Sequence, residues 1–178
     1  LYSSACLSDG LDSVDGQPET GSDQAYTRAA VVVGVLRYTA WSDVAFDNTA
    51  PGDLNICWYG KAPSISQLKR LSEQAYRVNR REIRVFEYSV SVSSRCHVVI
   101  VGAAAEYSRE PFEDLPSLSS VLIICDECQR EREFSAVRLK KAGAEIHFDV
   151  DLRVAERHSI TFGSRMLELA CRVEGISE

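Results

Sequence analysis

The sequence has no long hydrophobic run. Its longest apolar stretch, AAVVVGVL at residues 29–36, has eight residues, far fewer than the roughly 18 that a membrane-spanning helix needs. We therefore expect this stretch to form part of a buried helix. The chain has 178 residues, 45% of them apolar, which is enough for one globular domain with a substantial core.

Positive charge is also scarce. The chain carries 20 Lys and Arg residues against 26 Asp and Glu residues, for a net charge of -6. Nucleic-acid-binding proteins present a basic face, so no nucleic-acid partner is expected. The three histidines, His97, His147 and His158, do not combine with cysteines at zinc-site spacing. With no nucleophile–base pattern either, we expect a non-catalytic protein without a cofactor.

Cysteine, by contrast, is frequent and well placed. Four of the six cysteines, Cys57, Cys96, Cys125 and Cys128, lie on or beside predicted strands, and Cys6 and Cys171 lie near the ends. Such placements allow disulfides to fix strands relative to one another, and disulfides persist in oxidising compartments. The chain begins at Leu1, as it would after removal of a signal peptide. The sequence therefore predicts an exported protein.

Composition and periodicity predict the organisation. Residues 1–23 are rich in Ser, Asp and Gly and are expected to form a flexible arm; residues 24–178 form the domain. Spacings of three and four place Val32, Val33 and Leu36 on one helical face, with Arg28 and Arg37 off it. Helices are predicted over 24–42, 64–76, 152–158 and 162–171, with short ones in 104–118. Strands are predicted over 54–59, 82–86, 96–101, 121–125, 134–140 and 144–152.

Alternation of helices and strands predicts an α/β fold with parallel pairing. The last two strands flank a turn at Lys141, Ala142 and Gly143 and are expected to form an antiparallel hairpin. We expect a single domain with a mixed, mostly parallel sheet and helices on both faces.

Four blocks resemble a known family in sequence and order. They are TRAAVVVGVLRYTAWS at 27–42, LNICWYGKAP at 54–63, CHVVIVGAAAE at 96–106 and AGAEIHFDVDLRVAERHSITFGSRMLELA at 142–170. The chain resembles the YfiR (HmsC-like) family of periplasmic proteins over residues 24–173. The last block, with its closing S-R-x-L-x-L-A helix, is the most specific.

The resemblance implies a function. Family members look like periplasmic repressors that sequester the sensory periplasmic domain of an inner-membrane diguanylate cyclase. This sequestration lowers cyclic di-GMP and restrains biofilm formation. An OmpA-like outer-membrane lipoprotein can remove the repressor. The resemblance also implies a homodimer and a redox response through disulfides.

The cysteines have competing interpretations. Cys57 and Cys96 are 39 residues apart on two strands, where the family has its long bridge; a bridge would stabilise the fold by roughly 4 kcal/mol, but two buried thiols are the alternative. Cys125 and Cys128 form a C-x-x-C motif more closely spaced than the family's second bridge. This motif suits a small bridge or a dithiol oxidoreductase, although two acidic residues between the thiols would raise their pKa. A bridge between Cys6 and Cys171 would tether the arm, whereas a lone Cys171 would pack in the core.

A basic group provides a ligand-binding hypothesis. Arg157, His158 and Arg165 lie around the last two helices, and Arg37 could join them. Such a group could hold a phosphate, a carboxylate or a nucleotide, or it could be a solvated helix end. The alternative function is therefore a periplasmic sensor of a nucleotide, an aromatic amino acid or an anion.

Overall fold

The computed structural model describes residues 21–47, 52–89, 91–103, 118–128 and 134–175. Its helices are α1 (Gly21–Arg37), α2 (Ile65–Glu73), α4 (Leu152–Arg157) and α5 (Ser164–Leu169), with 3-10 helices η2 (Asp43–Phe46) and η3 (Ser93–Arg95). Its strands are β1 (Thr39–Trp41), β2 (Asp53–Tyr59), β3 (Arg77–Val78), β4 (Arg81–Glu87), β5 (Val98–Val101), β6 (Leu122–Asp126), β7 (Val137–Ala142), β8 (Glu145–Asp151), β9 (Ile160–Phe162) and β10 (Arg172–Glu174).

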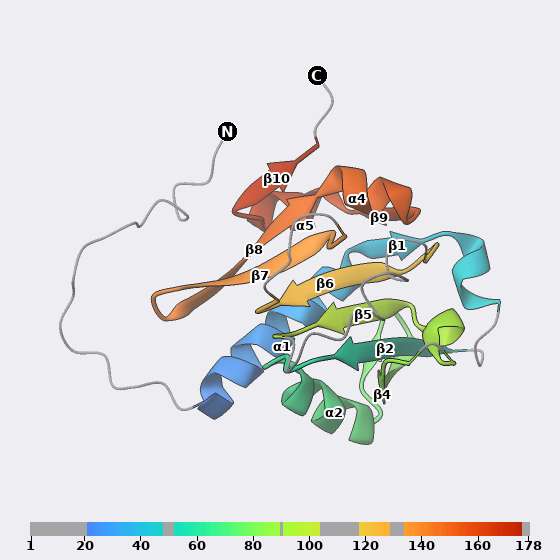
Figure 1. Ribbon diagram of the computed structural model, residues 1–178, viewed down its shortest axis with the longest axis horizontal. Helices are drawn as coiled ribbons and strands as arrows, with labels where there is room; N and C mark the ends of the chain where they lie inside the picture. The colour runs from blue at the N-terminus through green and yellow to red at the C-terminus, as the bar shows by residue number, and fades with distance from the viewer. Residues whose placement is uncertain (1–20, 48–51, 90, 104–117, 129–133, 176–178) are drawn as a thin grey trace.

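Eight strands form one mixed sheet in the order β10-β8-β7-β6-β5-β2-β4-β3 (Figure 1). Strands β7, β6, β5, β2 and β4 are mutually parallel. Strand β8 runs antiparallel to β7 and closes the hairpin, while β1 pairs with β9 in a separate two-stranded sheet. These pairings confirm the predicted α/β fold with a mostly parallel sheet and a late hairpin.

Buried apolar strands form the centre of this sheet. All four residues of β5 and all five of β6 are buried, as expected for parallel strands covered on both faces. Because side chains alternate along a strand, Ile56, Ile100 and Ile124 join the core cluster that includes Val32 and Leu36 of α1. Each described α-helix contributes buried residues to this cluster, which therefore lies on the helical face of the sheet.

The opposite face carries the cysteines. Its cluster contains Cys57, Cys96, Cys125 and Cys128 together with Val99 and Ile123. Val92, which precedes η3, packs against this cluster. The short helices predicted over 104–118, which would cover this face, lie almost wholly outside the described residues.

The first predicted helix was wrong at its end. It was expected to reach residue 42, but α1 ends at Arg37 and Thr39 begins β1. The Tyr38 backbone N–H donates to the Val35 carbonyl at 3.1 Å, and the Thr39 hydroxyl donates to the same oxygen at 2.8 Å. The backbone then leaves the helix because Thr39 pairs with Phe162 of β9, a long-range contact that helical periodicity cannot reveal.

Other differences concern short elements. Helix α1 begins at Gly21, within the predicted arm, and the last predicted helix is reduced to α5 because Phe162 belongs to β9. The short strands β3 and β10 were missed. In the described segments, no helix is both long and apolar enough to cross a membrane.

Candidate functional site

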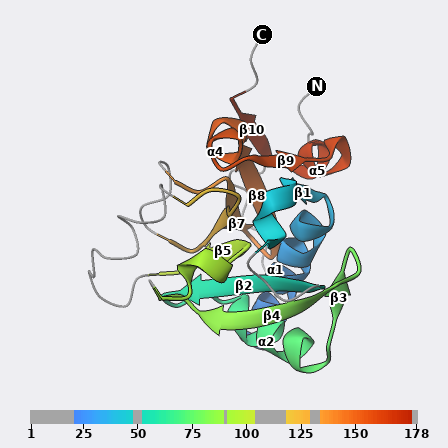
Figure 2. The ribbon, with the colours of Figure 1, turned by 90° about the vertical axis from the view of Figure 1, so that its right-hand side faces the viewer.

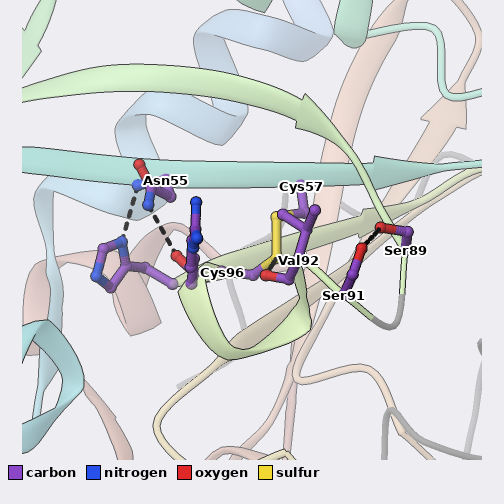
Figure 3. Close-up of a disulfide and its surroundings, with 8 residues drawn as sticks. Asn55, Cys57, Ser89, Ser91, Val92 and Cys96 are labelled. Atoms are coloured by element: carbon purple, nitrogen blue, oxygen red, sulfur yellow. Dashed lines mark hydrogen bonds between the residues drawn. A yellow bond between two sulfur atoms is a disulfide. The ribbon is translucent and has the colours of Figure 1, made fainter. Parts of the chain in front are cut away.

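A disulfide joins Cys57 at the centre of β2 to Cys96, which directly follows η3 and precedes β5. Cys57 and Cys96 are both buried, with exposures of 0% and 4%, and their Cα atoms are 5.7 Å apart. Figure 3 shows the bond beside Val92 and Asn55. The strands are already hydrogen-bonded neighbours, so the bond fixes the segment 92–96 against the sheet as well as closing a 39-residue separation.

Polar contacts lock the same segment. The Asn55 backbone N–H donates to His97 Nδ1 at 2.8 Å, and the Asn55 side-chain amide donates to the Arg95 carbonyl at 2.9 Å (Figure 3). Burial lowers the pKa of His97 to about 4, with a further lowering from Arg81, against opposing effects of a hydrogen bond to the Ala45 backbone and of Asp53. His97 is therefore neutral at pH 7 and acts as a fixed acceptor.

The second disulfide closes a tight loop at the carboxyl end of β6. Cys125 and Cys128 are bonded, with Cα atoms 5.4 Å apart. Glu127 between them has φ of 69°, a left-handed conformation that is uncommon outside glycine. The motif therefore forms a disulfide in this structure. The two acidic residues between its cysteines, Asp126 and Glu127, contact residues elsewhere in the fold.

Those partners form a buried ion cluster. Arg28 on α1 contacts Asp126 Oδ1 through Nη1 and Glu127 Oε1 through Nη2, both at 2.6 Å. Asp126 is fully buried, and its second oxygen, Oδ2, accepts the Ser64 backbone N–H at the start of α2 at 2.9 Å. One carboxylate therefore connects the disulfide loop to both long helices.

Sequence reasoning missed this cluster. Arg28 was placed off the apolar stripe of α1, whereas its side chain is 1% exposed. A buried arginine requires an anionic partner. The useful signal was an arginine in an apolar helix together with two acidic residues held in a C-x-x-C loop.

The carboxyl ends of β2 and β5 are closed by backbone contacts. In open α/β sheets ligands often bind where neighbouring strands connect in opposite directions, and these two strands mark that position. Here the Lys61 N–H donates to the Ala103 carbonyl at 2.7 Å, and the Ala103 N–H donates back at 3.1 Å. A Cβ on Gly102 would lie 2.2 Å from the Lys61 carbonyl carbon. Only glycine permits this approach.

The predicted basic group is distributed over several elements. Arg157 ends α4 and Arg165 lies on α5, both exposed, whereas His158 is 3% exposed. The His158 ring contacts the Leu118 carbonyl through Nδ1. Burial lowers the pKa of His158, and Arg157 lowers it further, against that hydrogen bond. Arg37 instead donates from Nη2 to the Tyr76 hydroxyl at 2.5 Å.

Two open hollows lie on the helical side. A hollow of about 270 Å³ between α1 and α2 is lined by Tyr26, Ala30, Gly34, Arg37 and Tyr76, among others. A second one, of about 180 Å³, is lined by Trp41, Phe46 and Arg81. Arg37 is the member of the predicted basic group that lines one of them.

Comparison with known families identifies the chain. The model of the YfiR/HmsC-like family matches residues 25–171, which include most of α1, the central strands and the Cys57–Cys96 and Cys125–Cys128 disulfides. The chain belongs to the YfiR/HmsC-like family. Membership supports a periplasmic location and a regulatory, non-catalytic role in diguanylate cyclase signalling. A search of curated proteins gave no match.

One further cysteine lies in the described part of the chain. Cys171 is also disulfide-bonded, and Cys6, its predicted partner, lies outside the described residues. The YfiR/HmsC-like match ends at Cys171, whose backbone N–H donates to the Phe148 carbonyl at 2.9 Å.

Proposed function

We propose that this protein binds the periplasmic sensory domain of an inner-membrane diguanylate cyclase and holds the enzyme inactive. Cyclic di-GMP then stays low and biofilm formation is restrained. The observation that carries the proposal is the family match over residues 25–171, which spans nearly all of the described fold. The closed disulfides support it, because they suit an oxidising compartment.

Two further elements belong to the proposal. An OmpA-like outer-membrane lipoprotein acts as the opposing partner that removes the repressor from the cyclase. Reduction of the disulfides weakens the fold and releases the cyclase. Support for the redox element comes from Asp126, which links the 125–128 loop to Arg28 and Ser64.

Calorimetric titration tests the binding step. The purified, oxidised protein is titrated with the isolated periplasmic domain of each diguanylate cyclase from the same organism. Stoichiometric binding to one domain is expected, weakened at least tenfold after reduction. A periplasmic domain from an unrelated membrane receptor is the control. Failure to bind any cyclase domain overturns the proposal.

The redox element of the proposal needs a separate control. The variant Cys125→Ser/Cys128→Ser lacks the Cys125–Cys128 disulfide and keeps the Cys57–Cys96 disulfide. Its affinity therefore shows which of the two disulfides governs binding. Circular dichroism at the titration temperature establishes that each form is folded. Equal affinity in the oxidised and reduced proteins contradicts the redox element and leaves sequestration standing.

A small-ligand sensor is the second candidate function. The observation in its favour is the hollow between α1 and α2, which presents the Arg37 guanidinium beside Tyr76. An anionic aromatic compound suits such a lining. A thermal-shift screen with nucleotides, aromatic amino acids and inorganic anions tests it. A ligand that raises the melting temperature, with the effect lost in Arg37→Ala or in Arg157→Ala/Arg165→Ala, supports the sensor; no shift with any compound opposes it.

A further inference from the structure

One long edge of the main sheet is only partly covered. Strand β4 pairs with β2 over residues 82–87, but on its other side β3 pairs only with Arg81 and Glu82. The Ile83 N–H on that side donates to the Tyr76 carbonyl at 3.0 Å. Beyond Ile83, no strand of the described residues pairs with this side of β4. Figure 2 shows β4 at the outer side of the sheet, with the short β3 at one end.

Hydrogen-bond parity shows which residues face this edge. The N–H groups of Glu82 and Tyr88 donate to Gly52 and Trp58 across β2, so the even-numbered residues of β4 bond inward. In a parallel pair the intervening residues point their N–H and C=O groups to the other side. Val85 and Glu87 therefore direct two donors and two acceptors outward.

The side chain between these residues is an exposed aromatic. Phe86 is 43% exposed and is paired in register with Cys57, so it lies on the disulfide face of the sheet. Residues 83–88 contain no proline, which would remove a backbone donor from the edge, and their charged side chains are Arg84 and Glu87. The edge thus keeps its pairing capacity next to an apolar side chain.

We propose that this edge pairs with the same edge of a second copy of the chain. The two β4 strands run antiparallel about a two-fold axis, with Phe86 opposite Phe86 of the second copy. This inference deepens the homodimer that family resemblance implies by naming its surface. It does not depend on the cyclase as partner.

Self-complementarity is the argument for a second copy. In this register Val85 lies opposite Glu87 of the other copy, and Glu87 lies opposite Val85. All outward N–H and C=O groups of these two residues are then paired, with four hydrogen bonds between the strands. A register centred on Val85 would place Ile83 opposite Glu87, but the Ile83 N–H is already bonded to Tyr76.

Side-chain chemistry agrees with the same register. Phe86 occupies the central non-hydrogen-bonded position, where opposing side chains approach most closely, and aromatic pairs stabilise such positions. No two like charges lie directly opposite each other, because each Glu87 faces Val85. A two-fold contact in which one patch meets itself is the usual interface of a homodimer.

Sedimentation equilibrium and backbone amide exchange test the interface together. The oxidised wild-type protein should show a monomer–dimer equilibrium, with slowed exchange at the Val85 and Glu87 N–H groups as concentration rises. In Phe86→Lys two cations meet at the centre, so the dimer dissociation constant should rise at least tenfold and the protection should be lost. The matched control is Tyr26→Lys, because Tyr26 is an aromatic residue that is 64% exposed on α1.

The outcomes separate this surface from the proposed function. A wild-type protein that remains monomeric at all concentrations overturns the inference and the homodimer. A dimer that is unaffected by Phe86→Lys, with fast exchange at Val85 and Glu87, overturns the surface alone. A monomer whose cyclase binding is lost in Phe86→Lys assigns the edge to the cyclase and also overturns self-pairing, while the sequestration proposal stands.

Discussion

Arg28 and Asp126 are 98 residues apart in the sequence and form a fully buried ion pair, with 2.6 Å between Nη1 and Oδ1. The pair connects α1 to the loop of the second disulfide, and Glu127 adds a second contact to the guanidinium. Removing both charges from water costs free energy, so the pair adds little net stability. We interpret it as fixing the position of the loop relative to α1, with each charge compensating the other.

Arg28→Met should therefore destabilise the protein strongly, because Asp126 would remain buried without a cation. The expected loss in the free energy of unfolding is about 3–5 kcal/mol, measured by urea denaturation. The double variant Arg28→Met/Asp126→Leu should recover part of it. Arg84→Ala is the control, since Arg84 is 46% exposed in its pair with Glu82 and such pairs contribute ~0–1 kcal/mol. Equal losses in both single variants would refute the buried-pair account.

The Cys57–Cys96 and Cys125–Cys128 disulfides should differ in their effect on stability. Cys57→Ala/Cys96→Ala opens a loop with a sequence separation of 39, and the chain-entropy model gives a loss of about 4 kcal/mol. Cys125→Ala/Cys128→Ala opens a separation of 3, for which the same model gives about 1.5 kcal/mol. Urea denaturation of both variants under oxidising conditions checks the order. A reversed order would show that the small loop acts mainly through Asp126.

Stability should fall in mild acid because of His97. Its folded pKa is about 4 and its ordinary value is 6.5, so the unfolded chain takes up a proton first as the pH falls. Nothing is lost above about pH 6.5; the loss in unfolding free energy grows as the pH falls towards 4, where it amounts to roughly 3 kcal/mol. Unfolding free energies of wild type and His97→Gln at pH 7.5 and pH 5 measure it. The variant should lose less stability between these two values; identical losses would exclude His97 as the titrating group.

Two glycines should respond in opposite directions to alanine. Gly102→Ala places a Cβ 2.2 Å from the Lys61 carbonyl carbon. The segments that follow β2 and β5 would therefore have to move apart. We expect a clear drop in melting temperature. Gly34→Ala on α1 meets no atom within 4 Å and should stabilise the helix by roughly 0.5–1 kcal/mol. A neutral Gly102→Ala would show that the loops are not held by the Lys61–Ala103 contacts.

The central sheet could be predicted because its signal is local. Runs such as 98–101 and 122–125 are continuously apolar, and their burial on both faces is confirmed. Strand β1 escaped prediction because TAW follows a helix without a break and becomes a strand only through β9. Strands as short as β3 and β10 have too few residues to show a period.

Only part of the candidate site could be predicted from the sequence. Cysteine spacing pointed to the regions of both disulfides, because their chemistry has few alternatives in an oxidising compartment. Arg28 was hidden because an ion pair between residues 98 positions apart leaves no local pattern. The predicted basic group joined Arg37 of the first helix to Arg157, His158 and Arg165, whereas in the structure Arg37 bonds to Tyr76 and His158 contacts Leu118.

Cellular cyclic di-GMP in a strain that lacks this gene tests the central claim most directly. The nucleotide is quantified by mass spectrometry in the deletion strain and after complementation with wild type or with Cys57→Ala/Cys96→Ala. Deletion should raise cyclic di-GMP, wild type should restore the low level, and the disulfide variant should restore it poorly. An unchanged or lower cyclic di-GMP level in the deletion strain would contradict a repressor.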